Sequence, residues 1–255
     1  MILSRISHAV RTQNWFAVAL EFLIVIAGVV IGFQVNAWNE GRQERALEAD
    51  ILVRLHREFT QLRDVGDRHL EAKTRQRALL SAWIEAGDAN GRLDVETFRT
   101  LTLDFYRQRD ADRAESLMDA TVSELLLAGL SASRAPEPSI TFQQLVASGD
   151  LRLLRSQALR AALGRYDTRR AAAASALQSN EGTSSLAMRR DILASTWNAA
   201  APGGEAGVAA IISDPGFVDW LRTMYALNAY NSSWYQGTQD EIAPVIALLE
   251  QEMGT

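Results

Sequence analysis

Apolar residues follow one another almost without interruption from Trp15 to Val35, and Glu21 is the only ionisable residue among them. An α-helix rises about 1.5 Å per residue, so roughly 20 apolar residues match the hydrocarbon core of a bilayer, about 30 Å thick. Trp15 stands at one end of this run and Trp38 just beyond the other, where amphipathic rings settle at the two headgroup layers. The pattern predicts a single transmembrane helix over residues 15–38.

Two other interpretations of this segment compete with a membrane anchor. A cleaved signal peptide is compatible with the small residues around Val35 and Ala37, but the apolar core of a signal peptide is usually only about 7–15 residues long. A buried helix of a soluble protein usually has a polar face, which this segment lacks. We therefore expect an uncleaved anchor, with a short cytoplasmic tail at residues 1–14 and an extracytoplasmic domain at residues 39–255.

Charge does not decide the orientation of the anchor. Arginines lie on both sides of it: Arg5 and Arg11 before, and Arg42, Arg45 and Arg54 after. A short basic tail usually stays in the cytoplasm, whereas a large following domain is translocated largely regardless of its charge. We expect a single-pass protein of the bacterial inner membrane with its C-terminal domain in the periplasm, and the opposite topology stays open.

One side of the predicted transmembrane helix gathers several small and polar residues. At 100° per residue, eight residues, two of them valines, lie within about 40° of one line: Asn14, Ala17, Glu21, Val25, Gly28, Gly32, Val35 and Asn39. Gly28 and Gly32 form a small-xxx-small pair that lets a second helix approach closely, and Glu21 can hydrogen-bond across such a contact. We interpret this side as a face for helix association, here named the association stripe: Asn14, Ala17, Glu21, Gly28 and Gly32. The alternative is a lipid-facing helix with a chance glycine pair and a snorkelling glutamate.

The residues after the anchor show helical periodicity. Apolar residues recur every three or four positions in a proline-free stretch that reaches "GDANG" at residues 87–91: Leu47, Ile51, Leu55, Phe59 and Leu62. This spacing predicts an amphipathic helix that continues directly from the anchor. Further helices are expected over Val95–Tyr106 and Ala114–Leu130, and "SASRAPEP" at residues 131–138 is the clearest loop.

Cap residues mark the helices of the second half. We expect Thr141 to be the N-cap of a short helix that Gly149 closes. A longer helix should then begin near Ser156 and run through an alanine-rich stretch towards Trp197.

Two further signals lie near the C-terminus. "AAPGGEAG" at residues 200–207 predicts a loop, and "SDP" at residues 213–215 predicts the start of the last long helix, which Pro244 should kink or split. No window alternates apolar and polar residues as a strand rich in β-branched residues does. We therefore predict an all-α fold, in which the anchor continues into an antiparallel, elongated helical bundle.

Composition narrows the classes of partner. The chain has 26 basic and 31 acidic residues; without Arg5, Arg11 and Glu21, 24 and 30 remain, so the part beyond the anchor carries about −6. This acidic balance argues against a nucleic-acid partner. The chain has no cysteine, which excludes disulfides, thiolate metal ligands and a cysteine nucleophile. Lys73 is the only lysine and alanine is abundant, which we interpret as the coding bias of a GC-rich bacterium.

The sequence carries no motif for catalysis or cofactor binding. His8, His56 and His69 have no paired spacing with other metal ligands, and "PGGEAG" at residues 202–207 lacks the spacing of a phosphate-binding loop. A nucleophile elbow is also absent from the sequence. We expect no enzymatic activity, no cofactor and no metal site.

Aromatic residues gather near the C-terminus: Trp220, Tyr225, Tyr230, Trp234 and Tyr235. Aromatic side chains can line a ligand pocket, which makes Trp220, Tyr225, Tyr230 and Trp234 a candidate pocket. Their helical spacing also fits core packing, which is the commoner role of such a pattern.

Two stretches resemble an uncharacterised family of bacterial membrane proteins, a domain of unknown function whose members begin with one such span. The first is similar through Asn14, Trp15, Phe16, Ala17, Val18, Glu21, Gly28, Ile31, Gly32, Gln34, Val35, Trp38, Asn39 and Arg42. The second is similar through Thr141, Phe142, Leu145, Ser148, Gly149, Leu151, Leu154, Arg155, Leu159, Leu163 and Tyr166. The resemblance implies a membrane-anchored helical protein without an assigned activity, and it supplies no catalytic residues.

Two functions follow from these patterns. The first is an interaction or assembly module in the lipid bilayer, which associates through the association stripe with its own copies or with another membrane protein. The second is a ligand-sensing bundle with the C-terminal aromatic residues as its pocket. A tail of about fourteen residues is too short for a transmitter, so a sensor would signal through a partner membrane protein.

Overall fold

The structure is a computed structural model that describes residues 15–130, 134–187 and 204–254; side chains are described for residues 19–130, 134–179 and 204–254. All regular elements among these residues are helices, which confirms the predicted all-α fold. The chain divides into two compact units, Met1–Ile51 and Leu52–Thr255.

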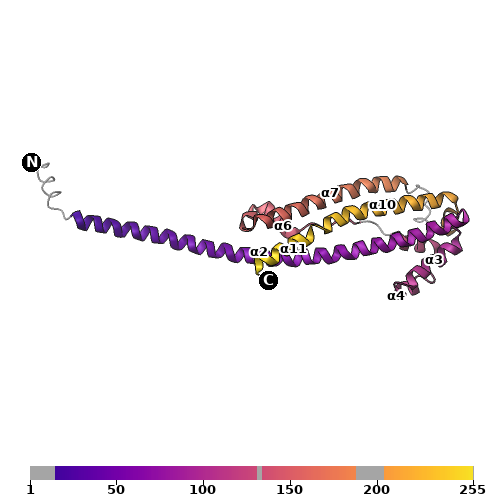
Figure 1. The fold of residues 1–255 in the computed structure, drawn as a ribbon, viewed down its shortest axis with the longest axis horizontal. Helices are drawn as coiled ribbons and strands as arrows, with labels where there is room; N and C mark the ends of the chain where they lie inside the picture. Colours follow the sequence, from indigo (N-terminus) through magenta and orange to yellow (C-terminus); the bar gives the residue numbers. More distant parts are fainter. Residues whose placement is uncertain (1–14, 131–133, 188–203, 255) are drawn as a thin grey trace, which may run out of the picture. The chain divides into compact units, whose positions relative to one another are not determined.

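Figure 1 shows the helices in chain order. They are α2 (Trp15–Asn90), α3 (Val95–Arg107), α4 (Ala111–Ser116), α5 (Val122–Gly129), α6 (Ile140–Ser148), the 3₁₀-helix η1 (Asp150–Leu153), α7 (Gln157–Ala187), α9 (Gly204–Ile212), α10 (Pro215–Gln239) and α11 (Ile242–Met253).

The first unit contains the N-terminal part of α2. Every described side chain from Ala19 to Glu40 is exposed, including the large apolar side chains of Phe22, Phe33 and Trp38. Among the described residues, α2 is the one helix long and apolar enough to cross a membrane, and none of its apolar stretch is buried within the protein. The predicted transmembrane segment is therefore helical and uncovered.

In the second unit, α10 runs antiparallel to the part of α2 that begins at residue 52 (Figure 1). His69 of α2 stacks on Tyr235 of α10, with 4.4 Å between the ring centroids. Two turns further along α2, Arg77 donates a hydrogen bond of 3.1 Å to the side-chain oxygen of Asn228. Residue numbers therefore rise along α2 as they fall along α10.

Helix α7 runs in the same direction as this part of α2. Phe59 of α2 packs edge to face on Tyr166 of α7 at 4.9 Å between centroids, and Arg165 pairs with Glu241 just beyond α10 at 3.4 Å. The prediction of an antiparallel bundle thus holds for α10 against its two neighbours but not for α2 against α7. The reason is that the connection over residues 91–156 returns the chain to its starting end before α7 begins.

A hydrophobic core forms where α2, α3, α5, α9 and α10 meet. Trp83 of α2 is fully buried in it, packs on the ring of Phe98 at 4.6 Å between centroids and donates its indole N–H to Thr102 Oγ1 at 3.2 Å. Leu126 of α5 and Val208 of α9 are buried in the same core. Trp83 therefore links several helices of this region.

Helix boundaries that depend on local signals agree with the sequence. The break at residues 87–91 is confirmed, because α2 ends at Asn90 and Gly91 has a positive φ of 72° that a side chain would strain. Helix α3 covers the predicted segment, with Asp94 accepting a hydrogen bond from the Thr97 N–H as N-cap. Pro215 begins α10, and Pro244 lies in the first turn of the separate helix α11, so the predicted split is confirmed.

The predicted single helix Ala114–Leu130 is wrong, because the structure divides this segment into α4 and α5. Thr121 and Glu124 form a capping box: the Thr121 hydroxyl accepts from the Glu124 N–H, and the Glu124 carboxylate accepts from the Thr121 N–H. This reciprocal cap satisfies backbone donors only if a new helix starts at residue 122.

The predicted N-cap at Thr141 is also wrong, because Ser139 caps α6 by accepting from the Phe142 N–H at 3.2 Å. Glu58 of α2 decides this boundary: its carboxylate accepts from the Ile140 N–H at 2.5 Å and from the Ser139 hydroxyl at 3.1 Å. A carboxylate at a helix N-terminus satisfies free N–H groups, here from a helix distant in sequence. The predicted closure at Gly149 is confirmed, with a φ of 77°.

Several predicted segments overlap residues outside the described ranges. In the predicted loop at residues 131–138, the described part, residues 134–138, lies in no helix. Ser156 accepts from the Leu159 N–H at 3.3 Å and so begins α7 as predicted, but the expected extension towards Trp197 falls within residues 188–203. The predicted loop at residues 200–207 is wrong in its second half, since α9 already begins at Gly204.

We expect Gly129→Ala to lower the free energy of unfolding by about 1–3 kcal/mol, the usual cost of overpacking a core. A Cβ at this position would overlap the indole ring of buried Trp83, which has no free space to retreat into. Gly164→Ala in α7 is the matched control, because a Cβ there meets no atom within 4 Å, and it should raise stability by about 0.5–1 kcal/mol. Urea denaturation followed by circular dichroism measures both; equal effects of the two variants would contradict this packing.

Candidate functional site

The described residues of the association stripe lie on an open helix surface. Glu21, Gly28 and Gly32 are exposed on α2, and a Cβ built at either glycine meets no atom within 4 Å. Asn14 lies outside the described residues, and so does the side chain of Ala17. The space that a partner helix would need is therefore present at both glycines.

The structure separates the aromatic residues that the sequence grouped. Trp220 is buried and stacks on Phe217 at 5.3 Å, whereas Tyr225 and Tyr230 are 39% and 49% exposed. Tyr230 and Trp234 lie together, edge to face at 6.3 Å between centroids. Because Trp220 and Trp234 are fourteen residues apart on α10, about 21 Å separates them along the helix axis. The structure thus brings together one pair of the four.

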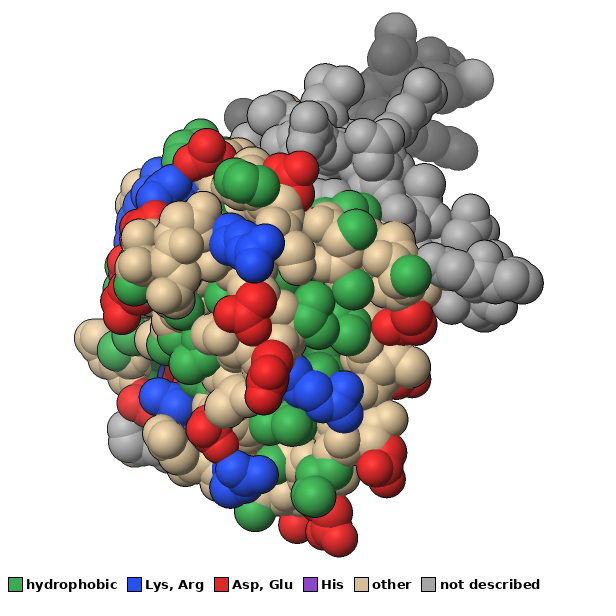
Figure 2. Space-filling model, turned by 90° about the vertical axis from the view of Figure 1, so that its right-hand side faces the viewer, with side chains coloured by type: hydrophobic (Ala, Val, Ile, Leu, Met, Phe, Trp, Pro, Cys, Tyr) green, Lys and Arg blue, Asp and Glu red, His purple; other side chains and the backbone are tan. Residues whose placement is uncertain are grey.

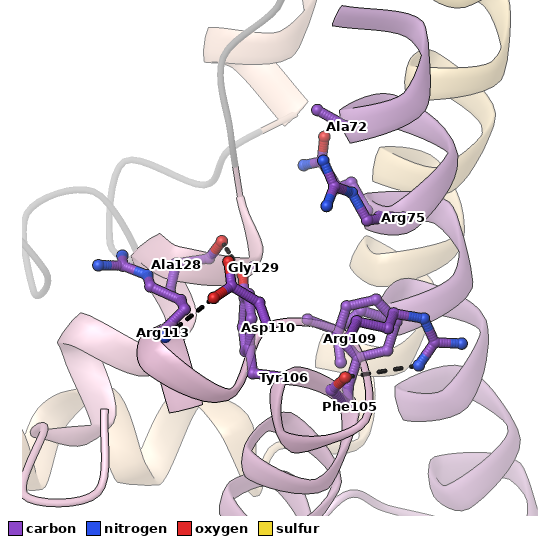
Figure 3. A pocket seen from close by; sticks show the side chains of 11 residues that line it. Ala72, Arg75, Phe105, Tyr106, Arg109, Asp110, Arg113, Ala128 and Gly129 are labelled. Atoms are coloured by element: carbon purple, nitrogen blue, oxygen red, sulfur yellow. Dashed lines mark hydrogen bonds between the residues drawn. The ribbon is translucent and has the colours of Figure 1, made fainter. Parts of the chain in front are cut away.

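A different pocket, of about 240 Å³, lies between α2, α3, α4 and α5 (Figure 3). Three arginines line it, Arg75 from α2 and Arg109 and Arg113 from the end of α3 and from α4, and we name it the arginine pocket. Its apolar wall includes Leu79 and the rings of Phe105 and Tyr106.

Local structure places the groups on one side of this pocket. Helix α3 ends at Arg107, and Asp110 then begins α4 by accepting a hydrogen bond from the Arg113 N–H at 3.0 Å. Tyr106 donates its hydroxyl proton to the carbonyl oxygen of Ala128 at 2.8 Å and so ties the end of α3 to α5. In Figure 3, Arg75 extends from α2 on one side of the pocket, and Asp110 and Arg113 lie on the other.

Few groups of the protein compete with a ligand for the guanidinium groups of the arginine pocket. Among the described residues, none of Arg75, Arg109 and Arg113 has a carboxylate within ion-pair distance. Arg109 lies over the ring of Phe105, with 4.2 Å from its guanidinium carbon to the ring centroid, and donates to the Phe105 carbonyl at 3.4 Å. Arg75 and Arg113 make no side-chain hydrogen bond within the described ranges.

The electrostatics of Tyr106 reflect these neighbours. Burial raises the pKa of the Tyr106 hydroxyl, Asp110 adds to this rise, and the positive charges of Arg113 and Arg75 oppose it. Tyr106 is therefore a neutral phenol at physiological pH, and its single proton is already donated to Ala128.

A buried polar cluster lies behind one wall of the arginine pocket: Lys73, Gln76, Arg77, Asn228 and Ser232. Gln76 belongs to both, since it lines the pocket while its Oε1 accepts from Lys73 Nζ at 3.1 Å and from Asn228 Nδ2 at 2.6 Å. Lys73 is 2% exposed, and burial, followed by the charge of Arg77, lowers its pKa from 10.5 to about 8. A largely protonated lysine therefore lies directly behind the pocket at pH 7.

His69 lies next to this cluster and stays neutral. Burial lowers its pKa to about 4, and the positive charges of Lys73 and Arg134 act in the same direction. Its ring stacks on Tyr235 at 4.4 Å between centroids. His69 is therefore half-buried against α10.

No family model, curated protein or solved structure matches this chain. The resemblance to the uncharacterised membrane family therefore stays a prediction, and the chemistry has to be inferred from the residues themselves. Within the part of the chain that the structure describes, no group of three or more histidine and carboxylate side chains could hold a metal ion.

Sequence reasoning missed the arginine pocket. Arg109 and Arg113 are four residues apart at a helix start, which is a weak local signal, but Arg75 is 34 residues earlier in the chain. Charged side chains of both signs are interspersed with hydrophobic ones on the face shown in Figure 2, so an arginine by itself carries little information. The pocket is recognised only when α2 and α4 are placed on either side of it.

Proposed function

We propose that this protein is a membrane-anchored helical module that acts by associating with membrane proteins or with its own copies, and not by catalysis. The exposed apolar surface of residues 19–38 carries this proposal. Soluble proteins rarely expose contiguous apolar patches beyond a few hundred Å², whereas an anchor needs such a surface on all sides. We infer that the anchor lies in the bacterial inner membrane and the helical second unit in the periplasm, because a large domain after an anchor is translocated largely regardless of its charge.

The association stripe supplies a reason for association beyond anchoring. A carboxylate within the hydrocarbon region costs a few kcal/mol on insertion scales, and a hydrogen-bonding partner on another helix would recover part of that cost. Glu21 lies on the same side as Gly28 and Gly32, where nothing in the described structure blocks the approach of a backbone. Close packing at the two glycines would bring such a partner within reach of the glutamate.

Disulfide crosslinking tests association between copies, because the chain has no cysteine of its own. Full-length Gly32→Cys, oxidised in native membranes, should give a band of doubled mass on a non-reducing gel. Val25→Cys, on the same side of the helix, serves as a second reporter that leaves both glycines intact. Leu23→Cys is the control, since it lies 180° from Gly32 at 100° per residue and should remain monomeric.

Each crosslinking pattern has a definite meaning. Dimers from Gly32→Cys and Val25→Cys but not from Leu23→Cys would support self-association through the association stripe. Adding Glu21→Val to Val25→Cys should then reduce the dimer yield several-fold. Equal dimer yields from Leu23→Cys and Gly32→Cys would show random collision instead. Monomers at all three positions would contradict association between copies and leave a different membrane protein as the partner of the stripe.

A further inference from the structure

We propose that the arginine pocket binds a small organic carboxylate, in which a charged group is attached to an apolar body. This inference goes beyond the proposed function, which concerns the transmembrane segment, and it lies entirely within the second unit. Four observations carry it: the size of the pocket, its excess of cationic groups, its apolar wall and the state of its tyrosine.

The volume of the pocket limits the size of the ligand. A water molecule occupies about 30 Å³ in the liquid, so 240 Å³ corresponds to about eight waters, or to a ligand of about eight to ten non-hydrogen atoms. Pockets for drug-sized molecules are usually about 300–1,000 Å³. The arginine pocket therefore suits a small metabolite better than a drug-sized molecule.

The charge of the pocket is opposite to that of the chain. The whole protein carries a net charge of −5, yet three arginines line this pocket and the amine of Lys73 lies behind its wall. Among the described residues, Asp110 is the only acidic one that lines it, and its carboxylate already accepts the Arg113 N–H. Because an arginine fork matches a carboxylate in bidentate geometry, unpaired guanidinium groups here select an anion.

The remaining wall selects an apolar body on that anion. Leu79 lines the pocket and is almost fully buried, and the ring of Phe105, which also lines it, lies under the Arg109 guanidinium. Tyr106 offers its ring but not its proton, which the Ala128 carbonyl accepts. The arginines are therefore the charged hydrogen-bond donors that line the pocket, while Leu79 and Phe105 offer carbon to the apolar part of the ligand. Inorganic phosphate would satisfy the first requirement but not the second.

Binding of simple carboxylates to the full-length protein in detergent micelles tests this proposal. Sodium benzoate and sodium hexanoate are the probes, and benzyl alcohol and hexanol are their neutral counterparts; saturation-transfer NMR detects contact, and a titration gives the dissociation constant. We expect both carboxylates to bind saturably and at least tenfold more tightly than the alcohols. Raising sodium chloride from about 50 to about 500 mM should weaken the carboxylates and leave the alcohols unaffected.

Substitutions locate the site. Arg75→Gln and Arg113→Gln should each weaken benzoate binding about tenfold, the usual effect of losing one hydrogen bond to a charged group. Arg92→Gln is the matched control, because Arg92 is exposed and does not line the pocket. All three positions are on the surface, so the circular dichroism spectrum should be unchanged.

Several results would overturn the proposal. Absence of saturable binding of both carboxylates would do so, as would equal affinity for the neutral alcohols. Benzoate binding that Arg92→Gln weakens as much as Arg75→Gln would place the interaction elsewhere. Tighter binding of inorganic phosphate than of benzoate would contradict the proposal that the ligand has an apolar part. None of these outcomes affects the crosslinking test of the transmembrane helix.

Discussion

Trp83→Ala is expected to lower the free energy of unfolding by about 4 kcal/mol, because it removes the largest fully buried side chain among the described residues. Trp83 packs on Phe98 at 4.6 Å between ring centroids and lies against Gly129. Its removal leaves a large cavity between α2, α3 and α5, and Thr102 loses the indole donor at 3.2 Å. Urea denaturation of the full-length protein in detergent, followed by circular dichroism, measures the change.

Two further variants separate the causes of this effect. Trp83→Phe keeps an aromatic ring but removes the N–H donor, so we expect a smaller loss of about 1–3 kcal/mol. Trp38→Ala is the matched control, since Trp38 is 60% exposed and should change the stability of the second unit by less than about 0.5 kcal/mol. A loss below about 1 kcal/mol for Trp83→Ala would contradict the central position of this side chain.

Lys73→Met is expected to raise the free energy of unfolding at pH 7 by about 2 kcal/mol. The folded protein holds the pKa of Lys73 at about 8, against 10.5 for an ordinary lysine, because the amine is buried and lies near Arg77. The charged amine is therefore less favourable in the folded than in the unfolded chain. Methionine has a similar length without the charge, and Gln76 keeps the hydrogen bond from Asn228.

The same shift predicts how stability depends on pH. Between about pH 8 and pH 10 the unfolded chain binds more protons at Lys73 than the folded chain does, so the stability of the native protein should rise with pH. A rise of about 1–2 kcal/mol is expected between pH 7.5 and pH 9.5, where tyrosines of the unfolded chain are still mostly protonated. Lys73→Met and Lys73→Arg should both abolish this rise, and only the methionine variant should be more stable at pH 7.

Urea titrations at pH 7.5, 8.5 and 9.5 distinguish the possible outcomes. A methionine variant that is less stable than the native protein at pH 7.5 would show that the hydrogen bonds of the amine outweigh the cost of burying it. A native protein whose stability stays constant over this range would contradict the lowered pKa of Lys73.

The positions of several helices could be predicted because their signals are local. Each of these signals is made by groups within a few residues of each other, so it can be recognised from the sequence alone. Examples are Asp94 before α3, Gly149 after α6 and Pro215 at the start of α10. The division between α4 and α5 is also local. The spacing of Thr121 and Glu124 is that of a capping box, but apolar periodicity across the whole segment suggested one helix.

Other features could not be predicted because they depend on distant contacts. The start of α6 at Ser139 rests on the carboxylate of Glu58, which is about 80 residues earlier in the chain. The sequence indicated the four C-terminal aromatic residues as a candidate pocket, but it could not show that Trp220 faces the core while Tyr230 faces outward. Helical spacing alone does not indicate which side of α10 the other helices cover.

The sequence by itself determined the long apolar N-terminal helix, the all-α class and most helix ends, since periodicity, caps and breakers act over one or two turns. Only the tertiary structure decided that Arg75 and Arg113 line one pocket and that the single lysine, Lys73, is buried beside it. The physical reason is that the energy of a charge depends on its surroundings: packing of distant helices buries the amine of Lys73, and it brings arginines from separate segments to one apolar wall.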